Sequence, residues 1–305
     1  MSHSKRMKKI SDSILTRCSL TALRVFQRTP RPLAYPIGRS LGWIAFHVWG
    51  RVRRIARTNL RAAFPDLSED KILAIARSTF MNWGVFLMES IRLPRFSQWE
   101  WKNRVVIEGR EHVENALEHG SGVILFTGHI GCFEMGAACV AHEGVPITAI
   151  ARYAKTPEMT EQITKIRSAA GYKVLAQDTR GFKAMQRLRA NEIVAMLIDQ
   201  DAHHHGVFVN FFGRPASTPP GPAVLALRTG AALVPGWVIR QTDGKYHMIV
   251  ESEIQVDSSD PSEENIRRIT QEMTTRLETI IRQYPDQWLW MHRRWKTQPA
   301  KQVKE

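Results

Sequence analysis

The sequence predicts an α/β fold in which a central, largely parallel sheet is flanked by helices. Two observations support this class. From Arg104 onward, short runs rich in β-branched residues alternate with helical patterns, as expected where crossover helices join parallel strands. Polar residues stand directly after several of these runs, at the edge of such a sheet where ligands bind. A chain of 305 residues is long enough to bury the large core that this fold needs.

The residues ahead of the sheet are predicted to form three helices. An amphipathic pattern covers residues 10–28, and a second helical stretch covers residues 41–64. Asp66 and Glu69 have the spacing of a capping box for a third helix, which reaches about residue 92.

The alternation from Arg104 onward places the later strands and helices. Apolar, β-branched runs predict strands at 105–107, 123–126, 147–151, 193–198 and 233–239. Helical spacing predicts helices at 111–118, 133–141, 157–170 and 181–190, and a long helix over 262–284. Ser217-Thr218-Pro219 has the pattern of a helix cap followed by an early proline, which predicts a further helix that reaches Arg228. Asp243-Gly244, followed by an apolar run at 246–250, predicts a hairpin.

The positive charge of the chain is concentrated near its N-terminal end. The formal net charge is +14. Residues 1–61 contain 14 lysines and arginines against the single acid Asp12, whereas the remaining residues carry 29 basic and 28 acidic side chains. A basic segment mixed with aromatic and aliphatic residues is typical of contact with an anionic membrane surface. We therefore expect N-terminal membrane-associating helices and no nucleic-acid partner; a basic arm on nucleic acid or a plain solvated tail is the alternative.

The best candidate for a membrane span is interrupted. Residues 33–50 contain Pro36, Arg39 and His47, and they fall short of the roughly 20 apolar residues that a span needs. The tryptophan-rich centre of this stretch suits a helix lying in the membrane interface, and a poor single span is the alternative. The basic start is not followed by the apolar region and cleavage site of a secretory signal. The three cysteines lack disulfide or metal spacing and indicate a reducing compartment.

The most informative motif is Gly128-His129-Ile130-Gly131-Cys132-Phe133-Glu134, between a predicted strand and a predicted helix. Five positions on a continuous helix rotate a side chain by about 140°. His129 and Glu134 can therefore converge only if His129 precedes the helix and Glu134 lies in its first turn. A neutral imidazole could then take the proton of an attacking hydroxyl, while the carboxylate fixes its tautomer. This predicts transfer of an acyl group to an alcohol; a histidine that only caps the helix is the alternative.

Other polar residues follow neighbouring strands. Asp199 and Asp201 close one apolar run, and they could bind a sugar, contact the base or hold a metal. Arg152 follows another predicted strand, and Arg167 lies on the next helix, so either could hold a phosphate or a carbonyl oxygen. A solvated loop and surface charges are the competing interpretations.

Three consecutive histidines, His203-His204-His205, suggest a metal site at first sight. Consecutive residues do not easily converge on one ion, and no partner ligands stand at zinc spacing, so we expect a polar loop, no metal and no other cofactor. A metal-dependent hydrolase that uses His129, Glu134 and these histidines is the alternative.

Several ordered motifs together resemble the bacterial lipid A biosynthesis acyltransferases. These are the late acyltransferases within the superfamily of lysophospholipid acyltransferases that carry a His-x4-Asp/Glu box. The resemblance covers about residues 40–297. Besides the box around His129, it rests on Asn59-Leu60 with Ala63-Phe64-Pro65, on Asp199-Gln200-Asp201 with Gly206 to Gly213, on Pro215 to Ala223, on Leu227 to Ala231, and on Pro285 to Lys296.

The resemblance implies an enzyme at the cytoplasmic face of the inner membrane. Such an enzyme transfers a fatty acyl chain, usually from acyl carrier protein, to a hydroxyl of a lipid A precursor or related glycolipid; acyl-CoA is the other donor. It implies His129 and Glu134 as the catalytic dyad, and Arg152, Arg167, Asp199 and Asp201 as substrate-binding residues. Acyl carrier protein, anionic membrane lipid and a glycolipid acceptor are the implied partners.

The resemblance also has limits. Thr156 stands where the family often has asparagine before the proline. Relatives that acylate phosphatidylinositol mannosides share the box, so the acceptor stays open, and an acyltransferase of another membrane lipid, a lysophospholipid or a glycolipid, is the alternative. Glycerol-phosphate acyltransferases carry aspartate at the position of Glu134 and also a block similar to Phe-Pro-Glu-Gly-Thr-Arg. This sequence has no such block, which argues against that class of enzyme. The expected division is a membrane-associating segment at 1–65, an acyltransferase α/β domain at 66–297 and a basic tail at 298–305. A non-catalytic binder of anionic surfaces remains the alternative from another class.

Overall fold

The computed structural model describes residues 20–152, 154, 156–176 and 180–299. Seven strands form the central sheet in the order β1-β9-β8-β2-β5-β3-β4. All neighbouring strands are parallel except β8 and β9, which confirms the predicted largely parallel sheet and the predicted hairpin. The strands are β1 Val105–Glu108, β2 Val123–Thr127, β3 Ile147–Ala151, β4 Lys173–Ala176, β5 Ile193–Leu197, β8 Ala232–Arg240 and β9 Tyr246–Val250.

Helices surround this sheet, and a separate two-stranded antiparallel ribbon is formed by β6 Val207–Phe211 and β7 Arg214–Thr218. The helices are α2 Arg31–Val48, α3 Gly50–Ala63, α4 Glu69–Arg92, α5 Gln98–Arg104, α6 Arg110–Glu118, α7 Phe133–His142, α8 Pro157–Ala169, α9 Arg180–Arg189, α10 Gly221–Thr229 and α11 Glu263–Gln283. Short 3₁₀ turns are η1 Leu93–Arg95, η3 His203–His205 and η4 Pro285–Gln287. Residues 20–28 are also helical.

The side chains of β2 alternate between two hydrophobic cores on opposite faces of the sheet. Ile124 and Phe126 pack in one core, together with residues of α9, α10 and α11. Val123 and Leu125 pack in the other, together with residues of α6 and α7. This period of two is the geometry of a strand that is covered on both faces, and it explains why β2 reads as a continuous apolar run.

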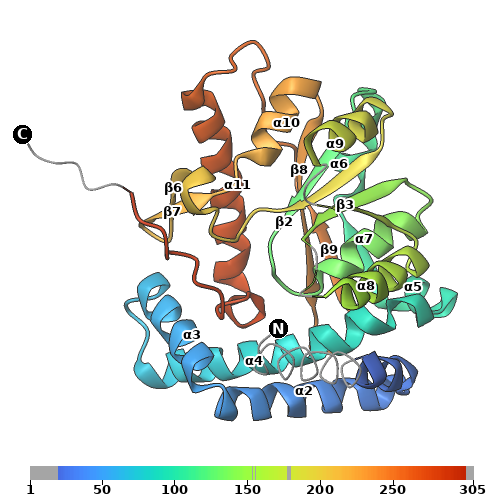
Figure 1. The fold of residues 1–305 in the computed structure, drawn as a ribbon, viewed down its shortest axis with the longest axis vertical. Helices are drawn as coiled ribbons and strands as arrows, with labels where there is room; N and C mark the ends of the chain where they lie inside the picture. Colours follow the sequence, from blue (N-terminus) through green and yellow to red (C-terminus); the bar gives the residue numbers. More distant parts are fainter. Residues whose placement is uncertain (1–19, 153, 155, 177–179, 300–305) are drawn as a thin grey trace, which may run out of the picture.

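Helices α2 and α4 lie side by side across one end of the sheet (Figure 1). Small residues make this close packing possible. The buried positions of α2 recur every fourth residue as Ala34, Gly38, Gly42 and Phe46. A Cβ atom on Gly84 of α4 would lie only 2.0 Å from the carbonyl oxygen of Gly38, so this contact needs glycine.

Because small residues occupy most of the inward-facing positions of α2, most of its bulky apolar residues other than Phe46 are left outside. This exposed apolar row is 42% to 70% exposed and consists of Leu33, Tyr35, Leu41, Trp43, Ile44, Val48 and the adjacent Trp49. In an ordinary surface helix the larger apolar residues face the core. Within the described ranges, no helix combines the length and hydropathy needed to cross a membrane.

Several predicted boundaries differ from the structure. The stretch at 41–64 is interrupted at Trp49, which leaves the helical region and separates α2 from α3. The third helix begins one residue after Ser68, whose hydroxyl accepts a bond from the Lys71 backbone, so the capping box predicted at Asp66 is wrong. Ser217 and Thr218 were expected to cap a helix but belong to β7, and α10 starts at Gly221.

The proposed domain division at residues 65 and 66 stays a prediction. Helix α4, which follows that boundary, packs beside α2, which precedes it. Residues 1–19, including the first half of the helix predicted at 10–28, lie outside the described residues, as do residues 300–305 of the predicted basic tail.

Candidate active site

The candidate site lies at the edge where the carboxyl ends of three adjacent parallel strands meet. His129 follows β2, Asp199 follows β5, and Arg152 follows β3. Neighbouring strands β2 and β5 are in register at Thr127 and Leu197, which places the residues after them side by side. This is the edge at which α/β proteins bind their ligands.

A hydrogen-bonded pair of His129 and Asp199 forms the centre of the site. His129 Nδ1 lies 2.7 Å from Asp199 Oδ1, and the backbone N–H of His129 donates to Asp199 Oδ2 over 2.6 Å. The indole of Trp288 donates to the same Oδ2 over 2.8 Å. A carboxylate held in this way accepts the Nδ1 proton and leaves Nε2 of the imidazole as the basic nitrogen.

The turn that carries His129 is fixed by the C-terminal part of the chain. Gly131 has φ = 56°, and its backbone N–H donates to the carbonyl of Gln287 over 3.0 Å. The His129 carbonyl accepts a bond from the Leu289 backbone, also over 3.0 Å. A Cβ atom at Gly131 would lie 1.9 Å from the Val238 carbonyl oxygen, so glycine is required both by the backbone angle and by the space.

Glu134 occupies the first turn of α7 and His129 precedes that helix, as the spacing predicts. The direct pairing of the two side chains is, however, wrong. Glu134 bonds instead to Arg167, over 2.6 Å at Nη2 and 3.1 Å at Nε, and to the hydroxyl of Tyr172. The turn at Gly131 separates the two residues of the box, while strand pairing supplies Asp199 as the partner of His129.

Arg167 connects Glu134 to a cavity of about 550 Å³ that His129 also lines. Its walls are mostly apolar, and they include Phe133, Ile150, Met185, Met196 and Leu225. Three arginines also line it: Arg152, Arg167 and Arg228. The structure thus brings the predicted residues Arg152 and Arg167 to one cavity with His129.

Asp199 and Asp201 do not lie on the cavity wall, whereas the residue between them does. The chain has left β5 here, and it bends at Gln200. Asp201 is 3% exposed; its Oδ2 accepts a bond from Thr297 over 2.8 Å and lies 3.2 Å from His203 Nδ1. The structure thus confirms, for Asp199, the interpretation in which a carboxylate contacts the base, whereas Asp201 has protein partners. The expected contacts of the two carboxylates with substrate stay a prediction.

The three consecutive histidines form the exposed turn η3. Within the part of the chain that the structure describes, no three His, Cys, Asp or Glu side chains gather in an arrangement able to hold a metal ion.

Comparison with known proteins identifies the family of the chain. The family model of the bacterial lipid A biosynthesis acyltransferases matches residues 3–297. The chain belongs to this family. It is an acyltransferase.

Individual relatives differ in the lipid that their names give. The chain is 27% identical to a lipid A biosynthesis lauroyltransferase of Escherichia coli, covering 93% of this chain and 92% of the relative. It is 27% identical to a lipid A biosynthesis palmitoleoyltransferase of the same organism, over 94% and 92%. It is also 27% identical to a phosphatidylinositol mannoside acyltransferase of Mycolicibacterium smegmatis, over 75% and 74%.

Four further residues of the site in this acyltransferase were not predicted from the sequence. Gln200 Nε2 lies 3.3 Å from His129 Nε2, and Trp288 holds Asp199. The ring of Trp83 on α4 stacks against the imidazole with 6.4 Å between centroids, and Tyr172 bonds Glu134. Gln200 lies in the Asp199-Gln200-Asp201 motif and Trp288 in the motif from Pro285 to Lys296, and this was the available signal. Trp83 and Tyr172 belong to no such motif.

The carboxylate of Asp199 is predicted to stabilise the fold in a pH-dependent way. Burial alone would raise its pKa, but the charge of His129 and the bonds from His129 and Trp288 outweigh burial and lower the pKa from 3.8 to about 2. A lowered folded-state pKa contributes stability above about pH 4 that is lost as pH falls from about 4 to about 2. This contribution is about 2 kcal/mol.

The measurement is the free energy of unfolding as a function of pH for the wild type and Asp199→Asn. We expect the wild-type curve to fall more steeply than the variant's between pH 4 and pH 2. Parallel curves in that window would show that Asp199 is not held as a carboxylate in the folded state.

Proposed function

We propose that this acyltransferase moves a fatty acyl chain from acyl carrier protein to a hydroxyl of a lipid A precursor or a related glycolipid, with His129 as the general base. The observation that carries the proposal is the His129–Asp199 pair, which leaves Nε2 basic at the wall of a largely apolar cavity. The relatives named for lipid A acylation cover nearly the whole chain and support this acceptor class.

In the proposed reaction, the hydroxyl oxygen of the acceptor attacks the thioester carbonyl carbon of the donor. Nε2 of His129 takes the hydroxyl proton as the new C–O bond forms. The carbonyl oxygen becomes negatively charged, and the guanidinium groups of Arg152 and Arg167 at the cavity wall are placed to stabilise that charge. When the C–S bond breaks, the imidazolium returns the proton to the leaving thiolate.

Asp199 supports this cycle in both protonation states of His129. In the resting enzyme it accepts the Nδ1 proton and selects the tautomer with a basic Nε2. In the transition state its negative charge, held by Trp288 and the His129 backbone, stabilises the imidazolium. The role that the sequence suggests for Glu134 thus passes to Asp199.

Glu134 is proposed to act through Arg167. The side chains of Glu134 and Arg167 are 12% and 19% exposed, and the two bonds between them fix the direction of the guanidinium. Burial and the charge of Glu134 raise the pKa of Tyr172, so its hydroxyl remains a donor to the carboxylate. Glu134 is accordingly a positioning residue in this proposal.

We predict that Glu134→Gln lowers kcat/KM by about 10- to 100-fold, because Arg167 loses a charged partner. The readout is steady-state acyl transfer, followed together with the pH dependence of the rate. The acid limb of the pH–rate profile, where protonation of the base His129 stops catalysis, should be unchanged. Glu143→Gln, which removes an acid from the end of α7 outside the site, should transfer at the wild-type rate. A shifted His129 limb in Glu134→Gln would return the orienting role to Glu134.

The exposed apolar row of α2 supports peripheral association with a membrane, proposed here to be the cytoplasmic face of the inner membrane. A helix lying in the interface presents bulky apolar residues to the lipid, and three arginines at 51, 53 and 54 follow the row. In this orientation the lipid acceptor reaches the sheet edge that α2 and α4 cover.

The test of the proposed function is mass spectrometry of lipid extracts from cells with and without the gene. We expect one acyl chain to be missing from a lipid A species in the deletion strain, restored by the wild type and not by His129→Gln. Loss of a chain from a phospholipid or a mannoside alone would assign another acceptor. Purified protein supplied with acyl carrier protein or CoA thioesters then identifies the donor.

A further inference from the structure

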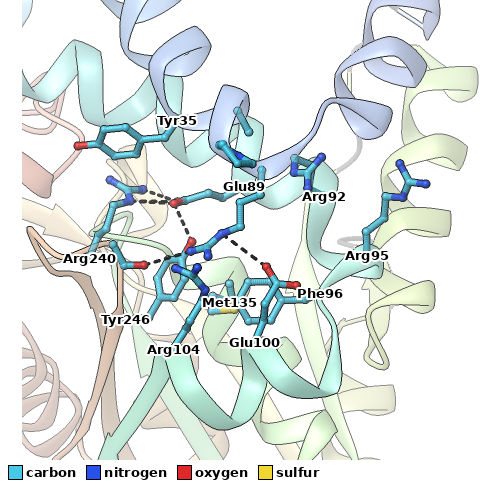
Figure 2. Close-up of a pocket in the computed structure, with 14 residues that line it drawn as sticks. Tyr35, Glu89, Arg92, Arg95, Phe96, Glu100, Arg104, Met135, Arg240 and Tyr246 are labelled. Carbon is cyan, nitrogen blue, oxygen red and sulfur yellow. Dashed lines mark hydrogen bonds and ion pairs between the residues drawn. The ribbon is translucent and has the colours of Figure 1, made fainter.

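A second cavity, of about 370 Å³, lies at the same edge of the sheet but is lined by different residues. It sits between α2, α4 and the ends of β8 and β9 (Figure 2). Arg240 ends β8, which runs parallel to β2, so this cavity and His129 share the carboxyl edge. Trp83 contacts His129, and Arg92 lies nine residues farther along α4, which places the cavity about 14 Å from the site along the helix.

This arginine pocket carries an excess of positive charge. Five arginines line it against two glutamates: Arg31, Arg92, Arg95, Arg104 and Arg240 against Glu89 and Glu100. Figure 2 shows Arg240 and Tyr246 turned toward Glu89, which they bind. The 5% exposed Arg240 is thus neutralised by Glu89, and Arg31 lies 3.5 Å from Glu100.

The other three arginines of the pocket, Arg92, Arg95 and Arg104, have no ion pair with any described residue. Arg92 Nη1 and Arg104 Nε are shielded from solvent without a hydrogen-bond acceptor among the described residues. Burial lowers the pKa of Arg92, and the nearby charges of Arg95 and Arg31 lower it further, against the opposing charge of Glu100. An anion with several oxygens would relieve both the repulsion and the missing acceptors.

The position of the pocket indicates where such an anion comes from. Tyr35 and Pro32 of α2 form part of its wall, and Tyr35 belongs to the exposed apolar row. A surface that rests on lipid through this row would hold the pocket at the depth of the headgroups. Phosphate oxygens are the anionic groups that headgroups present there, and guanidinium groups bind phosphate through paired N–H bonds.

We propose that the arginine pocket binds the phosphate group of a membrane lipid headgroup, at a site separate from the His129 cavity. Arg92, Arg95 and Arg104 supply the charge, and Arg92 and Arg104 supply the buried donors without acceptors, while Glu89 and Arg240 form the neutral floor. This inference rests on the proposed membrane association and not on acyl transfer. It gives the enzyme a lipid contact that orients α4, and with it Trp83, beside His129.

The test compares vesicles of phosphatidylcholine that contain either phosphatidic acid or oleic acid, matched for surface charge. The proteins are the wild type, Arg92→Gln/Arg95→Gln, and the control Arg267→Gln/Arg293→Gln, which removes two exposed charges elsewhere. We expect about tenfold tighter binding of the wild type and the control to phosphatidic acid than to oleic acid. The pocket variant should bind both vesicles equally, with an unchanged circular dichroism spectrum.

Each other outcome contradicts the inference. Equal wild-type binding to both vesicles would show that surface charge alone is recognised, and a preserved preference in the pocket variant would place the phosphate site elsewhere. Inorganic phosphate that raises the melting temperature of the wild type, without any vesicle preference, would assign a soluble phosphate ligand. A wild type that binds neither vesicle overturns the membrane association together with this inference, whereas loss of transfer in His129→Gln is unaffected by all of these results.

Discussion

Asp199→Asn should reduce kcat for acyl transfer by about 10³- to 10⁴-fold while changing KM little. The amide that replaces the carboxylate can no longer stabilise a positively charged imidazole, and its N–H₂ group can donate to Nδ1 and select the tautomer whose Nε2 is not basic. The substitution changes the 2.7 Å hydrogen bond between His129 Nδ1 and Asp199 Oδ1. Steady-state kinetics with purified protein, donor thioester and lipid acceptor measures the effect.

His129→Gln provides the comparison for this prediction. If the two residues act as one unit, the double variant is no slower than His129→Gln alone, because removing the base makes its partner irrelevant. Circular dichroism and thermal unfolding show whether each variant is folded. A folded Asp199→Asn with a kcat within tenfold of the wild type would contradict the pairing that the structure shows.

Replacing three residues of the exposed apolar row should release the enzyme from membranes. Leu41, Ile44 and Val48 recur on one side of α2 and are 42%, 49% and 70% exposed. Each aliphatic side chain that enters the lipid from a half-exposed position contributes about 1 kcal/mol, so Leu41→Ser/Ile44→Ser/Val48→Ser should lower the partition coefficient about 100-fold. Sedimentation with anionic vesicles measures this coefficient.

The control for this experiment is Val106→Ser/Phe182→Ser, which changes exposed apolar residues outside α2 (53% and 67% exposed). The control should bind vesicles like the wild type. Similar losses in both variants would show that exposed apolar area in general, and not α2, governs binding. Transfer to a detergent-dispersed acceptor should survive in the α2 variant, because His129 and Asp199 are untouched.

Most strands of the sheet could be predicted because the signals for a strand are local in the sequence. The runs at 123–126, 147–151 and 246–250 are buried strands with turn residues on either side, and the structure places strands at each of them. The short strand β4 was missed, since Lys173–Ala176 offers only four residues and no β-branched run. The break at Trp49 was missed because both flanking segments have helical patterns.

The site could be predicted only in part. The position of Glu134 in the first turn of α7 follows from spacing, and the prediction was confirmed. The partner of His129 depends on which strands are neighbours, and the sequence does not state that β5 lies next to β2. For the same reason the contribution of Trp288, 89 residues from Asp199 in the chain, could not be deduced from local patterns.

The membrane-facing surface of α2 illustrates a different limit. The sequence shows an apolar helix with tryptophans but does not say which side is buried. Packing against α4 decides this, since Gly38 and Gly42 allow close approach and turn the large residues outward. The arginine pocket likewise arises only when α2, α4 and β8 come together.

The pairing of His129 with Asp199 can be tested most directly by nuclear magnetic resonance of the protein labelled with ¹⁵N at histidine. The His129 signal is assigned by its loss in His129→Gln. We expect a protonated Nδ1 with a strongly deshielded proton in the wild type and in Glu134→Gln, and the loss of that proton signal in Asp199→Asn. A wild-type His129 protonated at Nε2, or a proton signal that disappears in Glu134→Gln and persists in Asp199→Asn, would contradict the assignment of Asp199 as the partner of the base.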